Sequence, residues 1–235
     1  EVSLASNGHL GKKTSYLVSA RQSYLQLLFS ALGLPFLPTF TDAQFKIKTR
    51  FDAKNELTVL GLGGIDNMRL NKKADGESNE YILGYLPKIQ QETFTLGTVY
   101  RHYAGANVQS VTVSHSYLND RNTKYKQNDE SSADNLILRL RSIEQNTQLR
   151  LMNSSSFGNW KIQAGASFDY SQYSNTTFQK IYTSGARTYN YHTNLGIWRT
   201  GIFGTATYAT ANDHFTASLG LRTDASNYSS SMNNI

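Results

Sequence analysis

Hydrophobic and polar residues alternate with a period of two along much of this chain. In the segment 43–52, Phe45 and Ile47 alternate with Lys46 and Lys48. The same alternation recurs, strongly or weakly, in 14–22, 56–64, 92–101, 107–117, 135–150, 160–170, 200–210 and 214–224. Such a pattern places one residue type on each face of a β-strand. It predicts an all-β chain of about nine or ten strands, many of them about ten residues long.

The connections between these segments alternate in length. Short turn-like segments lie at 52–56, 103–107, 156–159 and 211–214, and long polar links lie at 23–41, 65–91, 118–134 and 171–199. Short turns therefore gather at one end of an antiparallel sheet and long links at the other. Compact soluble domains seldom contain several links of this length, whereas outer-membrane barrels join short periplasmic turns with longer extracellular loops. The pattern favours a transmembrane barrel over a soluble sandwich or lipocalin-like barrel.

Two aromatic residues support the membrane interpretation. Trp160 and Tyr170 are ten residues apart on one predicted strand face. At about 3.3 Å per residue and a tilt near 45°, they are separated by roughly 23 Å along the membrane normal. Transmembrane barrels carry an apolar band about 25 Å tall with an aromatic girdle at each edge. Trp160 and Tyr170 are thus candidates for opposite girdles.

The most apolar stretch of the chain, Tyr24–Phe40, is not expected to span the membrane. It is shorter than the about 20 apolar residues that a spanning helix needs, and Gly33, Pro35 and Pro38 interrupt it. We expect a strand end, a helical turn and a proline-braced loop that folds against the rim or lumen of the barrel.

Composition excludes several function classes. The absence of cysteine excludes a disulfide framework and thiolate zinc sites. The net charge of +6 is spread along the sequence, so no nucleic-acid partner is predicted. No cofactor motif, metal-ligand spacing or catalytic signature is found, and 128–135 (NDESSADN) is expected to be a solvated acidic loop. Glycines of the segment 61–64 are expected to let a neighbouring element approach closely.

A set of basic residues is the candidate functional feature. If the apolar faces contact lipid, these residues point into the lumen, where they pair with carboxylates or attract an anionic substrate. The candidate lumen-facing residues are Lys46, Lys48, Arg50, Arg139, Arg141 and Arg222.

The order of several motifs resembles the barrel region of TonB-dependent outer-membrane receptors, of the branch common in Bacteroidetes. The motifs are SYLVSARQSYLQLLF, GLPFLPTF, VLGLGGIDN, YILGYLP, NDESSADN and LGLRTDASNYSSSM. The resemblance implies a barrel of about 22 strands closed by a plug. It also implies import of a scarce nutrient, such as a siderophore, cobalamin, glycan or peptide, with energy from the TonB complex.

We expect the chain to be a fragment of such a barrel, without the plug, the signal peptide or the last strands. Its expected partners are outer-membrane lipid, its own plug domain, the TonB complex through the missing N-terminal part, and the nutrient. No enzyme activity is expected. A complete small outer-membrane barrel acting as an adhesin or enzyme is the main alternative, and a soluble β-sheet binding protein is a third.

Overall fold

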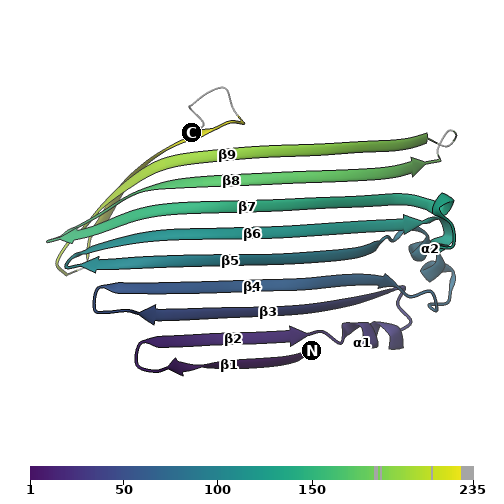
Figure 1. The fold of residues 1–235 in the computed structure, drawn as a ribbon, viewed down its shortest axis with the longest axis horizontal. Coiled ribbons are helices and arrows are strands. Elements are labelled where there is room, and N and C mark those ends of the chain that lie inside the picture. Colours follow the sequence, from purple (N-terminus) through teal and green to yellow (C-terminus); the bar gives the residue numbers. More distant parts are fainter. Residues whose placement is uncertain (183–184, 186, 213, 229–235) are drawn as a thin grey trace.

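The computed structural model describes residues 1–182, 185, 187–212 and 214–228, which form one antiparallel sheet of ten strands (Figure 1). The strands are β1 (Val2–Leu10), β2 (Thr14–Gln22), β3 (Phe36–Arg50), β4 (Asn55–Leu70), β5 (Lys88–Ala104), β6 (Asn107–Tyr125), β7 (Leu136–Phe157), β8 (Trp160–Ile181), β9 (Arg187–Ala209) and β10 (Thr216–Ser226). Each strand pairs with the strands next to it in sequence. The predicted all-β fold is confirmed.

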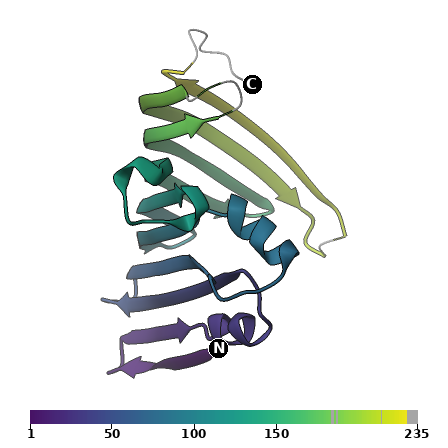
Figure 2. The ribbon, with the colours of Figure 1, turned by 90° about the vertical axis from the view of Figure 1, so that its right-hand side faces the viewer.

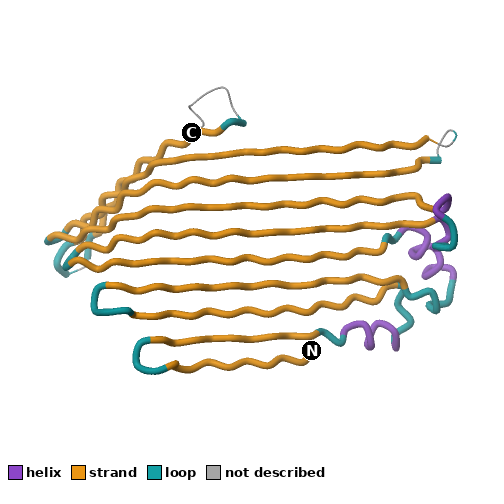
Figure 3. The backbone as a smooth tube through the Cα atoms, in the orientation of Figure 1, coloured by secondary structure: helices purple, strands orange, loops and turns teal. Residues whose placement is uncertain are grey.

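The two ends of the sheet differ, as the connection lengths predict. The short turns lie together at one end, and the helices lie at the other (Figure 3). Three of the short turns use a glycine with positive φ: Gly11 at 72°, Gly105 at 62° and Gly158 at 55°. Glycine adopts this conformation without steric cost, which closes the hairpins tightly.

Most strands are longer than the alternation predicts. β6 continues to Tyr125, and β8 continues to Ile181 before β9 starts at Arg187. The expectation of a long link over 171–199 was therefore wrong, because most of that segment is strand, and the link over 118–134 is shorter than expected. β1 is a further strand that the pattern did not predict. These extensions are polar on both faces, so they lack the alternation that marks a half-apolar strand.

The apolar stretch after β2 forms the short helix α1 (Leu25–Ala31) and then enters β3. The Ser23 hydroxyl accepts a hydrogen bond from the amide of Leu25 at 3.1 Å, and Gly33 ends the helix with a φ of 67°. The ring of Phe29 meets that of Phe36 edge-on, with 5.3 Å between centroids. The expected helical turn is confirmed. Among the described residues, no helix is both long and apolar enough to cross a membrane.

A second helix, α2 (Glu77–Tyr85), occupies the connection between β4 and β5. Figure 2 shows α1 and α2 on the same side of the sheet. Two single-turn 3-10 helices, η1 (Lys126–Asn128) and η2 (Ala133–Asn135), lie between β6 and β7.

The described residues contain almost no hydrophobic core. Ala74, Leu83 and Leu136 are the buried hydrophobic residues in this part of the chain, and none of them lies in the middle of the sheet. No second sheet covers either face, and β1 and β10 form the two edges of the described sheet. A soluble sandwich would bury one face of this sheet against another layer. The apolar side chains of this chain are instead left exposed.

Candidate functional site

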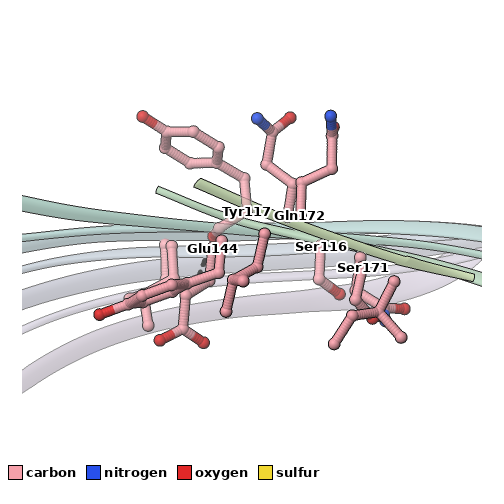
Figure 4. A pocket seen from close by; sticks show the side chains of 12 residues that line it. Ser116, Tyr117, Glu144, Ser171 and Gln172 are labelled. Carbon is pink, nitrogen blue, oxygen red and sulfur yellow. Dashed lines mark hydrogen bonds between the residues drawn. The ribbon is translucent and has the colours of Figure 1, made fainter. Parts of the chain in front are cut away.

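The strand register assigns each side chain to one of two faces, because successive residues of a strand point to opposite sides. We call the face that carries Lys46 and Lys48 the polar face, and the face that carries Phe45 and Ile47 the apolar face. Figure 4 shows the two directions in the middle of the sheet. Tyr117 and Gln172 project to one side, and Ser116, Glu144 and Ser171 project to the other.

The register places four of the six predicted basic residues on one face, and their lumen-facing role stays a prediction. Lys46, Lys48 and Arg50 share the polar face, with Leu60, Thr58 and Glu56 as their partners on β4. Following the pairing from strand to strand places Arg222 of β10 on the same face. The cross-strand partners of these residues, taken from strand to strand, define the polar face across the whole sheet.

Arg139 and Arg141 lie on the apolar face, so the prediction that they share a face with Lys46 was wrong. On β7 the polar face is carried by even-numbered residues, as the pairing of Thr112 with Arg150 shows. A change of one residue in register moves every side chain of a strand to the other face. The sequence of β7 alone does not define this register.

A buried carboxylate organises the polar face near the turns. The side chain of Glu56 is 2% exposed, and its oxygens lie 3.0 Å from Lys48 Nζ, 3.2 Å from Arg50 Nε and 3.3 Å from Arg101 Nη1. The carboxylate thus receives charge-assisted hydrogen bonds from three cations on the two strands that flank β4, namely β3 and β5. Lys48 and Arg50 are held in structural pairs. Sequence reasoning missed Glu56, which faces Arg50 because the hairpin turns at 52–54 with Phe51 opposite Asn55.

A second charged cluster lies on the polar face at the other edge of the sheet. Arg222 donates two hydrogen bonds to Asp224, at 2.6 and 2.7 Å. The carboxylate of Asp224 occupies the space where a Cβ of Gly201 would lie. Asp169 and Arg199 are paired opposite each other on β8 and β9. Arg222 is therefore also engaged with a carboxylate.

Between the two clusters, a shallow pocket of about 380 Å³ opens on the polar face (Figure 4). Hydroxyl and amide groups line it together with the apolar side chains of Leu118, Leu195 and Ile197, and Glu144 supplies its carboxylate. Asn146 donates to the hydroxyl of Ser171 at 2.7 Å, and the hydroxyls of Thr95 and Ser116 lie 2.9 Å apart. Such a surface offers hydrogen bonds to a peptide or polar ligand and contains no nucleophile next to a base.

The apolar face carries two rows of aromatic residues. The turn-side row contains Tyr100, Phe157, Trp160 and Tyr208, and the loop-side row contains Phe94, Tyr117, Tyr170 and Trp198. Trp160 packs against Tyr208 with centroids 5.1 Å apart, and Phe94 stacks on Tyr117 at 5.3 Å. The register also places Tyr170 opposite Trp198.

Exposed aliphatic side chains fill the band between the two rows. Ile202, Leu219 and Leu221 are 62%, 71% and 77% exposed. A contiguous apolar surface of this kind requires a nonpolar environment. The predicted girdle residues Trp160 and Tyr170 lie at its two borders, on one face of β8.

The long connections are joined to one another at the loop end. The ammonium of Lys124 is buried and donates to the carbonyl of Leu83 in α2 at 2.5 Å and to the Asn128 side chain at 2.6 Å. Asn79 donates to the carbonyl of Gly33 at 3.1 Å, which ties α2 to the end of α1. These contacts hold the three connections as one structured cap.

The acidic segment 128–135 contributes to this cap. Glu130 lies 2.6 Å from Lys88 Nζ, and this hydrogen bond holds the pKa of Glu130 below its ordinary value. Asp129 accepts hydrogen bonds from the amide of Ser131 at 3.0 Å and from Asn135 at 2.8 Å. The acidic groups are therefore engaged within the loop. Among the described residues, no group of three or more His, Asp or Glu is placed to hold a metal ion.

Solved outer-membrane receptors share this fold. The chain is similar to the pyoverdine outer membrane receptor FpvA from Pseudomonas aeruginosa PAO1, with a TM-score of 0.69 and 12% identity over 95% of this chain and 38% of the receptor. For the RagAB peptide importer the TM-score is 0.64 at 10% identity, covering 95% of this chain and 31% of that one. For the copper transporter OprC it is 0.62 at 13% identity, covering 91% and 33%.

These similarities show the fold. The chain has the fold of part of the β-barrel of TonB-dependent receptors, as the sequence motifs indicated. It spans about a third of the length of the solved chains that it matches. No protein-family model and no curated protein matches the sequence.

Proposed function

We propose that this chain is part of the barrel wall of a TonB-dependent importer in the outer membrane of a Gram-negative bacterium. One observation carries the proposal: two aromatic rows border an exposed aliphatic band on one face of a ten-stranded antiparallel sheet. From Trp160 to Tyr170 the band is roughly 23 Å tall, which matches the hydrocarbon thickness that outer-membrane barrels span. In this proposal the apolar face contacts lipid and the polar face lines the lumen.

The polar face then has two roles. The Glu56 and Arg222 clusters brace the wall, because their cations are already paired with carboxylates. Lys46 is exposed, and no ion pair is found for it among the described residues. We assign Lys46 and the Glu144 pocket to contacts with the plug domain or with the imported nutrient.

The side chains of the polar face agree with a role in import rather than in catalysis. The polar face carries hydroxyl, amide and paired charged groups. At the loop end, the structured connections are the part of the protein that a nutrient arriving from outside would contact first. The receptors and transporters of similar fold are described as acting on pyoverdine, copper and peptide. A scarce nutrient taken up with energy from the TonB complex is the function that we propose for the complete protein.

Fractionation of the source cells tests this proposal. An antibody against the 126–135 connection is used to probe inner-membrane, outer-membrane and soluble fractions after electrophoresis. We expect an outer-membrane band several times larger than the 26.3 kDa of this chain. An outer-membrane band at 26.3 kDa would replace the importer with a small barrel, and a soluble band would overturn the membrane assignment.

A further inference from the structure

The apolar face is hollowed from β1 to β6. A cavity of about 1030 Å³ lies there and is bordered by Phe94 and Leu96. Gly63 adds no side chain to its floor, whereas the space over Gly61 is filled by the ring of Phe45. The cavity is lined mainly by nonpolar atoms and opens on the lipid side of the proposed barrel.

A second pocket of about 410 Å³ lies on β4, β5 and β6, nearer the loop end of these strands. Four cations line it: Arg69, Lys72, Lys88 and Arg121. The register places Gln90 directly opposite Arg121, which keeps this pocket on the apolar face. The lipid side of the sheet therefore changes from nonpolar to cationic along β4, β5 and β6.

Two carboxylates balance only half of these cations. Glu130 lies 2.6 Å from Lys88 and 3.6 Å from the second lysine of the pocket. Glu92 lies 3.1 Å from Arg121. No carboxylate partner is found for Arg69 among the described residues. Four cations and two carboxylates leave an excess of two positive charges.

The height of the pocket matches a lipid headgroup. Gln90 and Arg121 each lie four residues beyond Phe94 and Tyr117 of the loop-side aromatic row. Four residues correspond to about 9 Å along the membrane normal at a tilt near 45°. The polar headgroup layer occupies roughly this depth outside the hydrocarbon core.

We propose that the two hollows form one binding site for a phosphate-bearing lipid of the outer leaflet. An acyl chain occupies the glycine-lined cavity, and the phosphate is bound in the cationic pocket around Arg69. This inference rests on the proposed function, since it requires the apolar face to contact the bilayer. The lipid is chosen over an acidic protein because the cation pocket lies next to a nonpolar cavity of larger volume on the same face.

Native mass spectrometry of the detergent-solubilised full protein tests the site. Phosphatidic acid and diacylglycerol with identical chains are titrated separately, so that the phosphate is the difference between the two ligands. We expect phosphatidic acid to bind more tightly. Because one basic residue near a lipid surface is worth about a factor of five in affinity, Arg69→Gln weakens this binding about fivefold. Arg69→Gln combined with Arg121→Gln weakens it about 25-fold.

A charge-matched control is available at the same end of the sheet. The variant Lys126→Gln with Arg187→Gln removes two exposed cations that do not line the pocket. Its affinity for phosphatidic acid is expected to stay within twofold of the parent protein. An equal loss in this control would mean that overall charge, rather than the pocket, binds the lipid, and would overturn the proposal.

Two further results would contradict the lipid site. Equal affinity for phosphatidic acid and diacylglycerol would show that the phosphate is not recognised. Complete displacement by millimolar inorganic phosphate would identify a site for a free anion. If the protein fractionates with the outer membrane, either result defeats this inference and leaves the proposed function intact. If the protein is found in the soluble fraction, both the inference and the proposed function are defeated.

Discussion

If the apolar face contacts lipid, a charged side chain at Ala166 of β8 should destabilise the protein. Ala166 lies on the apolar face of β8, with Leu151 and Ile202 as its cross-strand partners. It is six residues from Trp160 and four from Tyr170, or about 14 and 9 Å along the membrane normal at a tilt near 45°. Ala166 is therefore close to the middle of the apolar band.

The cost of Ala166→Arg follows from that depth. An arginine on the lipid face of a barrel costs about 2–4 kcal/mol near the midplane. This corresponds to a loss of about 30-fold to 1,000-fold in the folding equilibrium in the membrane. The matched control is Gln163→Arg on the polar face, where the cross-strand partners are Ser154 and Thr205. The control is expected to change stability by less than about 0.5 kcal/mol.

Urea unfolding of the full protein in lipid vesicles, followed by tryptophan fluorescence and by gel mobility with and without heating, measures both variants. We expect the unfolding midpoint to fall for Ala166→Arg and to stay constant for Gln163→Arg. Equal destabilisation by the two variants would show that the apolar face is no more in contact with lipid than the polar face is. Greater destabilisation by Gln163→Arg would mean that the faces have been assigned in reverse.

Three further predictions concern the charged groups. Glu56→Gln leaves three cations without their shared carboxylate and is expected to lower the free energy of unfolding by about 1–3 kcal/mol. The same urea assay measures this change, and an unchanged midpoint would contradict the bracing role of Glu56. Lys124→Met removes the buried hydrogen bonds to α2 and should speed protease cleavage within α2 while the strands stay intact. Glu130 has a lowered pKa, so its contribution is present above its ordinary pKa and is lost as the pH falls through the folded value. Hydrogen exchange in the 126–135 connection should therefore rise in acid, and Glu130→Gln should remove that pH dependence.

The sequence predicts the strands best where one face is apolar. The segments 43–52, 160–170 and 214–224 alternate clearly, and β2 has the same bounds as the more weakly alternating segment 14–22. Above the loop-side aromatic row the alternation disappears, because both faces of β6 and β8 are polar there. The extension from Asn119 to Tyr125 is an example, and periodicity cannot separate such a strand from a polar loop.

Membership of a face could be predicted within a strand but not between strands. Lys46, Lys48 and Arg50 follow one another at a spacing of two, so their common face is certain from the sequence. Arg139 and Arg141 have the same spacing, yet their face depends on the pairing of β7 with β6. β6 and β7 are joined by the long connection 126–135, which does not define a register, so that pairing is set by the whole ladder of hydrogen bonds.

Glu56 and Arg69 illustrate a second limit. Glu56 forms an ion pair with Arg101, which lies on another strand. Arg69 lines the cation pocket together with Lys88, which also lies on another strand. Their neighbours in sequence do not reveal these contacts. A hairpin register drawn from a three-residue turn at 52–54, with Phe51 opposite Asn55, places Glu56 opposite Arg50.

The central claim is that the apolar face contacts lipid and the polar face contacts water. These 235 residues contain no cysteine. Once any cysteine elsewhere in the full protein is replaced by serine, single cysteines at 163, 164, 166, 167 and 168 can carry spin labels in the protein reconstituted in vesicles. Collision with oxygen, which concentrates in lipid, and with a water-soluble nickel chelate is then measured at each position. We predict that 164, 166 and 168 collide mainly with oxygen and that 163 and 167 collide mainly with nickel. Preferential nickel collision at all five positions would contradict the membrane barrel.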